Sequence, residues 1–289
     1  MRGCIAFALA VITSACGPAP RPANGGDDDD DDGSDAGNNP NGDCADATEL
    51  IYTIDQFNYR LSRFDPSTKM FADLGSLACP STMGGTPFSM SVDRTGNAWV
   101  LYNSGELFKA PISNVTACTK TTWASQAGLR VFGMGFSTDA AGGSSETLWV
   151  GGGQTQTQAQ YTLAKMDLAS MTATPVGTQT QLPEMTGTGN AELWGFMPSA
   201  TDARIVKFDK QNGAALTTFN EPTLAGSMTG YAFAHWGGDF WVFLIKNGEP
   251  ATTVYQVDGM TGAIKGTTPT QGRTIVGAGV STCAPVVIF

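Results

Sequence analysis

The sequence predicts an all-β fold: a single β-propeller of five four-stranded blades, in which the C-terminal strand closes the first blade. Three observations favour this fold. A strand-like phrase returns five times, a pair of small residues recurs beside each copy, and the two ends of the chain supply complementary strands. A repeat of roughly 40 to 50 residues is typical of propellers with four-stranded blades.

The repeated phrase consists of an apolar residue, a variable one, usually a basic or polar one, an apolar one and usually Asp. Its copies begin at residues 61, 107, 163, 205 and 254, so successive copies lie 46, 56, 42 and 49 residues apart. We expect each copy to be the third strand of a blade. Four copies end in aspartates, which we interpret as turn residues before the fourth strand. These are Asp65, Asp167, Asp209 and Asp258.

Pairs of small residues two positions apart indicate the innermost strands. Residues with this spacing share one face of a strand, and small side chains are needed where blades converge at the axis. The pairs are Ser89/Ser91, Gly133/Gly135, Gly187/Gly189, Ala232/Ala234 and Gly277/Gly279. An apolar second strand follows at 97–101, 147–150, 193–196 and 240–244. The tryptophans in these strands, Trp99, Trp149, Trp194 and Trp241, occupy matching places, which indicates packing between blades.

The two ends of the chain together supply one blade. A second-strand segment at 50–54 has no inner strand before it, and the last inner strand, at 274–281, has no outer strands after it. Joining them closes the ring and leaves no open sheet edge between the ends. Apart from Cys16 and the cysteine of the leader, four cysteines remain, which allow three pairings. Ring closure predicts Cys44–Cys283, and Cys79–Cys118 follows by elimination; the wide spacing argues against a zinc site.

The first residues predict an export signal at 1–15. Arg2 precedes an apolar stretch at 4–12, which is too short to span a bilayer permanently. The sequence TSAC at 13–16 resembles the bacterial lipobox, although Thr13 stands where a branched aliphatic residue is usual. We therefore expect a lipid on Cys16; the alternative is an ordinary cleaved signal peptide with an incidental cysteine. Gly17, in place of Asp, favours the outer membrane, with the domain facing the periplasm or the cell exterior.

Residues 16–43 are predicted to be a lipidated cysteine followed by a disordered tether, and 44–289 the propeller domain. The tether is rich in Asp, Gly and Pro and can bury little apolar surface. Asp28, Asp30, Asp32 and Gly33 mimic the opening of a calcium loop, but Asn39 stands where the closing Glu is expected. A solvated spacer is therefore the favoured interpretation.

Charge excludes one class of partner. The formal net charge is -10, of which the aspartates at 27–32 supply six, leaving about -4 for the rest of the chain. Since no basic patch is evident, nucleic acid is not an expected partner. The low charged fraction of 15% and the 36 glycines suit short strands and tight turns.

Several phrases resemble a family of propeller lipoproteins from Gram-negative soil bacteria. They lie at residues 87–93, 132–136 with 146–148, 186–189, 232–239 and 275–285. The resemblance covers nearly all of residues 44–285 and implies an exported propeller. The family carries no assigned activity, so the resemblance implies no particular reaction.

Catalytic residues are sparse. His235 is the one histidine, at the predicted end of an inner strand, and neither a Gly-x-Ser-x-Gly elbow nor a His-Glu-x-x-His motif is present. Carboxylates beside inner or second strands are the more plausible reagents, since two that converge could perform acid–base work on a glycan. These are Glu146, Glu184, Glu192 and Asp239. No catalytic residue, metal site or cofactor is assigned; the ligand-binding candidates are Glu146, Glu184, Thr186, Thr188, His235, Trp236 and Asp239.

The favoured function is a membrane-tethered binding or scaffolding propeller outside the cytoplasm, held to the membrane by its lipid alone. Its expected partner is an envelope protein, a peptide or a glycan, because propeller loops surround a central depression. One alternative is a hydrolase or lyase that acts on a saccharide or lactone through carboxylates, with or without a metal. Another is a purely structural envelope protein, which would show no concave polar site. The enzyme requires Glu146, Glu184, His235 and Asp239 to share a cavity.

Overall fold

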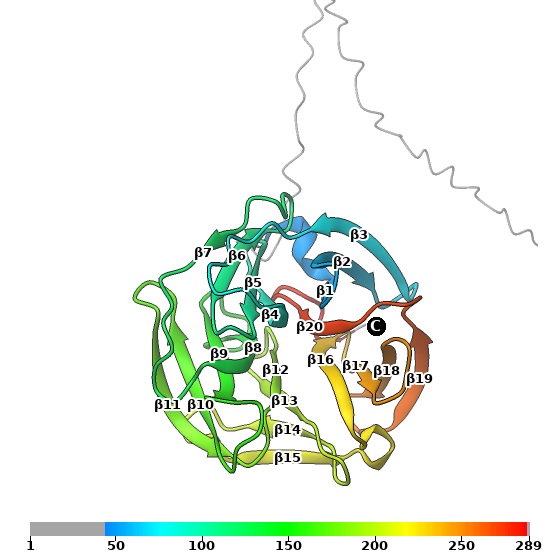
Figure 1. The fold of residues 1–289 in the computed structure, drawn as a ribbon. Helices are drawn as coiled ribbons and strands as arrows, with labels where there is room; N and C mark the ends of the chain where they lie inside the picture. The colour runs from blue at the N-terminus through cyan, green and yellow to red at the C-terminus, as the bar shows by residue number, and fades with distance from the viewer. Residues whose placement is uncertain (1–43, 288–289) are drawn as a thin grey trace, which may run out of the picture. The chain divides into compact units, whose positions relative to one another are not determined.

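A computed structural model describes residues 44–287 and confirms the predicted fold. Five four-stranded antiparallel sheets form a ring, and the inner strands of neighbouring sheets contact one another around the axis (Figure 1). From the inner to the outer strand, blade 1 is β20 (Ile275–Gly279), β1 (Ile51–Asp55), β2 (Arg60–Asp65) and β3 (Met70–Ser76). Blade 2 is β4 (Pro87–Val92), β5 (Asn97–Tyr102), β6 (Leu107–Pro111) and β7 (Thr119–Lys120).

The other three blades are formed by consecutive strands. Blade 3 is β8 (Val131–Thr138), β9 (Glu146–Gly153), β10 (Tyr161–Asp167) and β11 (Thr172–Gln179). Blade 4 is β12 (Glu184–Gly187), β13 (Leu193–Met197), β14 (Arg204–Phe208) and β15 (Ala215–Asn220). Blade 5 is β16 (Met228–Trp236), β17 (Asp239–Lys246), β18 (Thr253–Asp258) and β19 (Ile264–Pro269). Two 3-10 turns complete the described elements, η1 (Asp46–Glu49) and η2 (Pro222–Leu224).

The repeated phrases form the third strands, as expected. The carboxylate of Asp65 accepts hydrogen bonds from the backbone N–H groups of the turn that follows, and Asp167, Asp209 and Asp258 do the same. These aspartates therefore hold the turns between third and fourth strands. These aspartates recur because each of these turns needs the same backbone hydrogen bonds.

Close approach of the inner strands explains their small residues. A Cβ atom on Gly133 of β8 would lie 2.2 Å from the carbonyl oxygen of Pro183, and one on Gly135 would lie 2.7 Å from Cα of Thr186. Both contacts are far inside van der Waals distance, so blade 3 can approach blade 4 only with glycine at these positions. The pair in blade 4 is partly irregular, because β12 ends at Gly187 and Gly189 lies in the loop beyond it.

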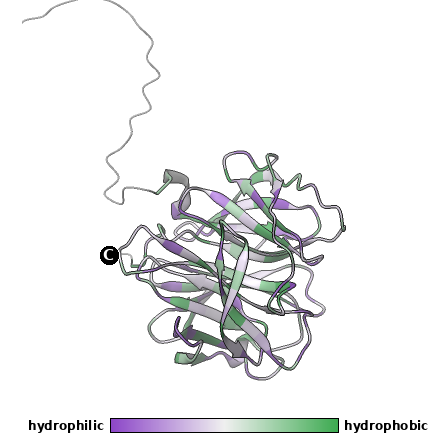
Figure 2. Ribbon diagram, turned by 90° about the vertical axis from the view of Figure 1, so that its left-hand side faces the viewer, coloured by the Kyte–Doolittle hydropathy of each residue, from purple (hydrophilic) through white to green (hydrophobic). Residues whose placement is uncertain are grey.

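Side chains between the blades form the core. The four second-strand tryptophans are buried, with exposed fractions of 2 to 6%. Trp194 of blade 4 packs against Phe240 of blade 5 with ring centroids 4.7 Å apart, and Trp241 of blade 5 packs against Phe64 of blade 1 at 5.4 Å. Hydrophobic segments recur along the strands seen from the side of the ring (Figure 2). The tryptophans therefore act in packing, as predicted.

Strand β20 pairs with β1, so segments from both ends of the described chain complete blade 1 (Figure 1). The disulfide Cys44–Cys283 lies beside this closure and joins residues 239 positions apart. The second disulfide, Cys79–Cys118, spans 39 positions. Both predicted pairings are confirmed.

Several predictions fall on residues outside the described range. They are the export signal, lipidation of Cys16, the tether and the calcium-loop alternative at 28–39. In the described part of the chain, no helix has the length and apolar character needed to cross a membrane.

Candidate functional site

The ring has two mouths, defined here by the direction of the inner strands. The first mouth is the end at which the five inner strands begin, and the second mouth is the end at which they finish. A cavity of about 110 Å³ lies at the first mouth. Its lining comes from the starts of inner strands and the loops beside them: Gln56, Pro87, Phe88, Asn103, Gln156, Glu184, Met228, Thr229, Gly230, Tyr231 and Val276.

Glu184, the first residue of β12, is the acidic side chain of this cavity. Only 2% of its surface is exposed, and its Oε1 accepts a hydrogen bond from Oγ of Ser89 in blade 2 at 2.6 Å. A Cβ on Gly133 would lie 2.7 Å from Oε2, so the glycine also makes room for the carboxyl group. Burial raises the pKa of Glu184 well above its usual value, and the Ser89 hydrogen bond offsets this only in part. Burial therefore favours the protonated, neutral form of this carboxylic acid.

A larger cavity of about 530 Å³ adjoins the first one and extends between blades 3, 4 and 5. The two cavities share Gln156, Met228 and Tyr231 in their linings. The remaining lining residues of the larger cavity are Thr157, Tyr161, Thr180, Gln181, Leu182, Pro198, Ser199, Ala200, Gly226 and Ser227. We call the two cavities together the first-mouth groove.

Tyr231 stands where the two cavities meet. Its Oη donates to the carbonyl oxygen of Leu182 at 3.4 Å, and its ring lies edge-on to Phe196. Burial raises the pKa of the Tyr231 hydroxyl, and the nearby Glu184 carboxyl adds to the shift. The phenol therefore stays protonated and is available as a hydrogen-bonding group.

An exposed aromatic residue lies next in sequence to the lining of the inner cavity. Phe57 is 74% exposed and follows Gln56, which lines the inner cavity. Oδ1 of Asp55 accepts from the backbone N–H of Phe57 at 3.0 Å, and Oδ2 accepts from that of Thr274 at 2.8 Å. The turn that presents Phe57 is thus fixed by a buried carboxylate.

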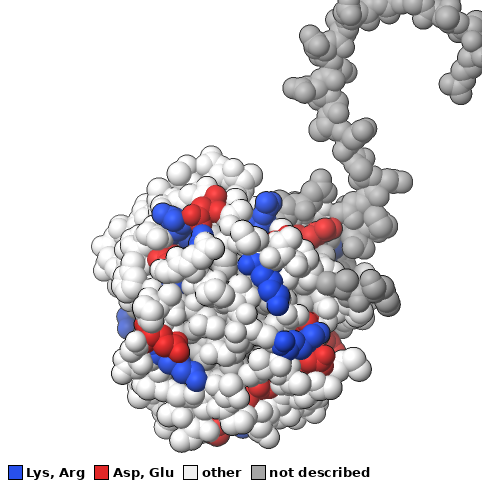
Figure 3. All heavy atoms as spheres, turned by 90° about the vertical axis from the view of Figure 1, so that its right-hand side faces the viewer, with Lys and Arg blue, Asp and Glu red and all other residues white. Residues whose placement is uncertain are grey.

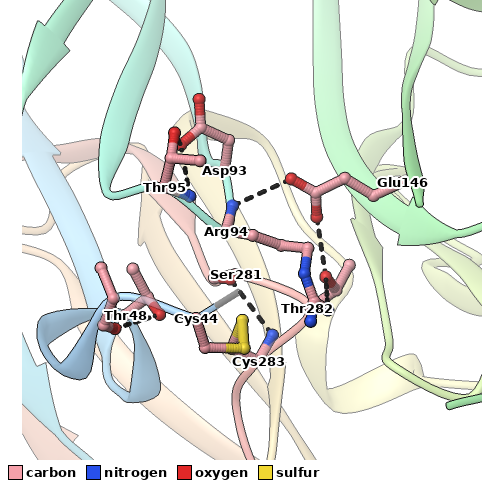
Figure 4. Close-up of a disulfide and its surroundings, with 10 residues drawn as sticks. Cys44, Thr48, Asp93, Arg94, Thr95, Glu146, Ser281, Thr282 and Cys283 are labelled. Atoms are coloured by element: carbon pink, nitrogen blue, oxygen red, sulfur yellow. Dashed lines mark hydrogen bonds between the residues drawn. A yellow bond between two sulfur atoms is a disulfide. The ribbon is translucent and has the colours of Figure 1, made fainter. Parts of the chain in front are cut away.

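The second mouth contains the ring disulfide and a different set of polar groups (Figure 4). Thr282 Oγ1 accepts from Nη1 of Arg94 at 3.1 Å and donates to Oε2 of Glu146 at 2.7 Å. Oε1 of Glu146 accepts from the backbone N–H of Arg94 at 2.9 Å. Burial raises the pKa of Glu146, although these hydrogen bonds oppose the shift. A cavity of about 240 Å³ lies here, lined by Cys44, Arg94 and Cys283 among others.

His235 lies between blades 4 and 5. Its backbone N–H donates to Oγ1 of Thr186 at 3.2 Å, and its ring meets the edge of Phe240 with centroids 5.5 Å apart. Burial lowers the pKa of His235 to about 4, against the attraction of Glu192 and Asp239. The imidazole is therefore neutral at physiological pH and belongs to the packing between two blades.

The other sequence candidates also have structural partners. Trp236 is 9% exposed, and its Nε1 donates to the carbonyl oxygen of Glu49 at 2.6 Å, which ties blade 5 to the segment before β1. Asp239 of the second strand, β17, forms an ion pair at 2.9 Å with Lys265 of the outermost strand of blade 5, β19. Oγ1 of Thr188 accepts from backbone N–H groups of its own turn.

The carboxylates and the histidine therefore do not converge. Glu184 faces the first mouth, Glu146 the second, and His235 and Asp239 contact neighbouring strands of blades 4 and 5. Among residues 44–287, no group of three or more His, Cys, Asp or Glu side chains is arranged to hold a metal ion.

The sequence predicted Glu184 as a ligand-binding residue, but it did not predict the other residues that line the groove. Phe88, Asn103, Gln156 and Tyr231 line the inner cavity but belong to no chemical motif. One signal was present: Phe88 and Tyr231 lie near the starts of predicted inner strands, as Glu184 does. Aligning the five repeats by those starts would have grouped them.

Comparison with known proteins adds little. No protein-family model and no curated protein matches the chain. Among solved structures, a luciferin-regenerating enzyme is similar at 10% identity and a TM-score of 0.46, covering 81% of this chain and 76% of that one. Regucalcin, a calcium-binding protein from Agrobacterium tumefaciens, is similar at 11% identity and a TM-score of 0.47, covering 83% and 77%. At these values the similarity supports no assignment of function.

Proposed function

We propose that this chain is a lipid-anchored binding protein of the cell envelope, and that its ligand occupies the first-mouth groove. The observation that carries the proposal is the groove itself, a concave polar site at one end of a rigid, closed ring. A purely structural protein would have no need of such a site. The scattered positions of Glu146, Glu184, His235 and Asp239 favour binding over carboxylate catalysis.

Disulfides support a location outside the cytoplasm. Cys44–Cys283 and Cys79–Cys118 both have bonding geometry, and such pairs persist in oxidising compartments. The lipobox-like sequence that ends at Cys16 supplies the anchor. An outer-membrane position, and membership of the resembling lipoprotein family, are parts of the same proposal.

The point of attachment favours this arrangement. The described chain begins at Cys44, which lines the cavity at the second mouth. An anchor joined through that residue is attached on the second-mouth side of the ring. The first-mouth groove opens on the opposite side, where a ligand from the surroundings has access to it.

Two experiments test the proposal. Metabolic labelling with a fatty acid should mark the full chain and fail to mark its Cys16→Ser variant, and the labelled chain should fractionate with membranes. Capture from solubilised envelope should then recover a ligand with the wild type. Gln156→Arg places a long charged side chain in the groove and should abolish capture. Gln211→Arg, an equally exposed glutamine in a turn at the second-mouth end, is the control and should retain it.

Loss of capture by both variants, or by neither, would contradict the assignment of the groove. Labelling that persists in Cys16→Ser would contradict the anchor.

A further inference from the structure

The charge of the first-mouth groove restricts its ligand. No lysine or arginine lines either cavity, and Glu184 is the sole acidic residue in the two linings. Because burial favours the neutral form of that carboxyl, the groove offers little formal charge to a ligand. An ionic ligand would lose its hydration here without gaining a counter-charge, which is costly. The groove therefore favours an uncharged polar ligand.

The groove also has unused hydrogen-bonding capacity. Five of its lining side chains form no hydrogen bond with any group in the described part of the chain: Gln56, Gln156, Thr157, Thr180 and Ser227. Amides and hydroxyls each offer both donors and acceptors. Sugar hydroxyls require both at once, so this set matches a polyhydroxylated ligand better than one with acceptors alone.

Apolar surface accompanies these polar groups. Phe88, Met228 and Val276 line the inner cavity, and Leu182 lines the larger one. Phe57 adds an exposed ring next to Gln56, on a turn whose backbone Asp55 holds in place. Aromatic faces pack well against the C–H faces of sugar rings, for which a charge-free polar groove with an aromatic rim is a suitable receptor.

Size sets the scale of the ligand. The larger cavity, at about 530 Å³, lies within the range of about 300–1,000 Å³ that small-molecule sites occupy. The inner cavity of about 110 Å³ accepts a single substituent. A short segment of saccharide fits this pair of volumes.

We propose that the first-mouth groove binds a neutral saccharide, with hydroxyl groups bonded to Gln156 and its polar neighbours and one sugar ring stacked on Phe57. This inference rests on the proposed binding function and specifies its ligand class. Glu184 closes the inner end of the groove as an uncharged hydrogen-bonding group.

The test uses the full chain, with Cys16→Ser for solubility, in titration calorimetry against three sets of probes. They are neutral oligosaccharides (β-glucan, α-glucan and chitin fragments), oligogalacturonates as an acidic set, and unstructured peptides. We expect binding to members of the neutral set alone, with an affinity that changes little between low and high salt.

Variants locate the site. Phe57→Ala should weaken binding by about 2- to 10-fold, while Met260→Ala, an exposed apolar control at a second-mouth turn, should leave it unchanged. Gln156→Ala should weaken binding, and Gln211→Ala should have no effect.

The experiments distinguish a wrong ligand class from a wrong site and from a wrong binding function. Binding of peptides or acidic glycans that Gln156→Arg blocks, without binding of neutral sugars, would overturn the saccharide and leave the binding function intact. Neutral-sugar binding that survives both Phe57→Ala and Gln156→Arg would overturn the site. The absence of any Gln156-dependent ligand, in these titrations and in envelope capture, would overturn both proposals.

Discussion

The ring disulfide should stabilise the fold more than the local one does. Cys44–Cys283 closes a loop of 239 positions and Cys79–Cys118 one of 39. In the chain-entropy model, restriction of the unfolded chain gives about 5.5 kcal/mol for the longer loop and about 3.9 kcal/mol for the shorter. The expected difference, about 1.6 kcal/mol, depends only on the logarithm of the ratio of loop lengths.

The measurement compares two chains that each retain one disulfide and carry Cys16→Ser. Cys79→Ala/Cys118→Ala retains the ring disulfide, and Cys44→Ala/Cys283→Ala retains the local one. Each is unfolded in urea in its oxidised and reduced forms, so that packing lost through the alanines cancels within each chain. The free energy of unfolding is extrapolated to water, with attention to any change in slope.

We expect oxidation to raise the free energy of unfolding more in the chain with Cys44–Cys283. An equal or smaller gain for that chain would refute the reasoning, because it would mean that the unfolded ring is already restricted without the disulfide. Pairing of β1 with β20 in a compact denatured state would have that effect.

Three further substitutions are predicted to alter stability. Glu184→Gln should become progressively stabilising relative to wild type as pH rises from 5 to 8. Because the pKa of Glu184 is raised in the folded state, ionisation favours unfolding, and the stability of the wild type falls by at most about 1.4 kcal/mol per pH unit. A difference in melting temperature that does not change with pH would contradict a neutral buried carboxyl. Glu106→Gln should behave oppositely. Burial raises the pKa of Glu106, but hydrogen bonds from Lys120, Ser81 and Thr82 outweigh it and hold the pKa below its usual range. The loss in the free energy of unfolding should be about 1.5–3 kcal/mol at pH 7 and should shrink as pH falls below about 4, with pH-dependent urea titrations as the check. Gly133→Ala should cost about 1–3 kcal/mol or more through its clash with Pro183. Gly266→Ala in β19 is the control, because its Cβ would meet only Nζ of the flexible Lys69 side chain at 3.9 Å, and it should change stability by less than about 0.5 kcal/mol. Equal urea midpoints for the two variants would contradict the close approach of the blades.

The fold was predictable because its determinants are local and repeated. A third strand such as residues 107–111 matches β6 at both ends, and the small-residue pair at 133 and 135 marks the inner strand β8. Each blade repeats the same sequence pattern, so a deviation in one copy does not obscure the repeat. Closure by β20 followed from counting which strands lacked neighbours.

The site was less predictable, because it depends on which way each side chain turns. His235 and Glu184 both lie on inner strands, yet Glu184 faces the first mouth and His235 packs between two blades. Trp236, which the sequence favoured for a pocket, instead bonds to Glu49. Such contacts join segments far apart in the chain, and local sequence patterns do not predict them.

One face of the ring shows no large patch of a single charge. On the face that includes β3 and β19, acidic and basic side chains are interspersed among a larger uncharged area (Figure 3). Ion pairs such as Arg273–Asp73 and Lys265–Asp239 neutralise part of this charge locally. Association with a neutral ligand would therefore proceed at rates that salt affects little.

The inner strand of blade 1, β20, comes from the C-terminal part of the described chain, so blade 1 cannot be completed early in folding. During synthesis from the N-terminus, β1, β2 and β3 are made first, but their inner partner β20 lies more than 200 positions later, as the separation of Tyr52 from Gly279 shows. Until it arrives, β1 presents an unpaired edge and Cys44 lacks its disulfide partner. A product truncated before β20 retains both features, which expose it to aggregation and proteolysis. The first blade can thus be completed only after synthesis has passed Gly279, the last residue of β20.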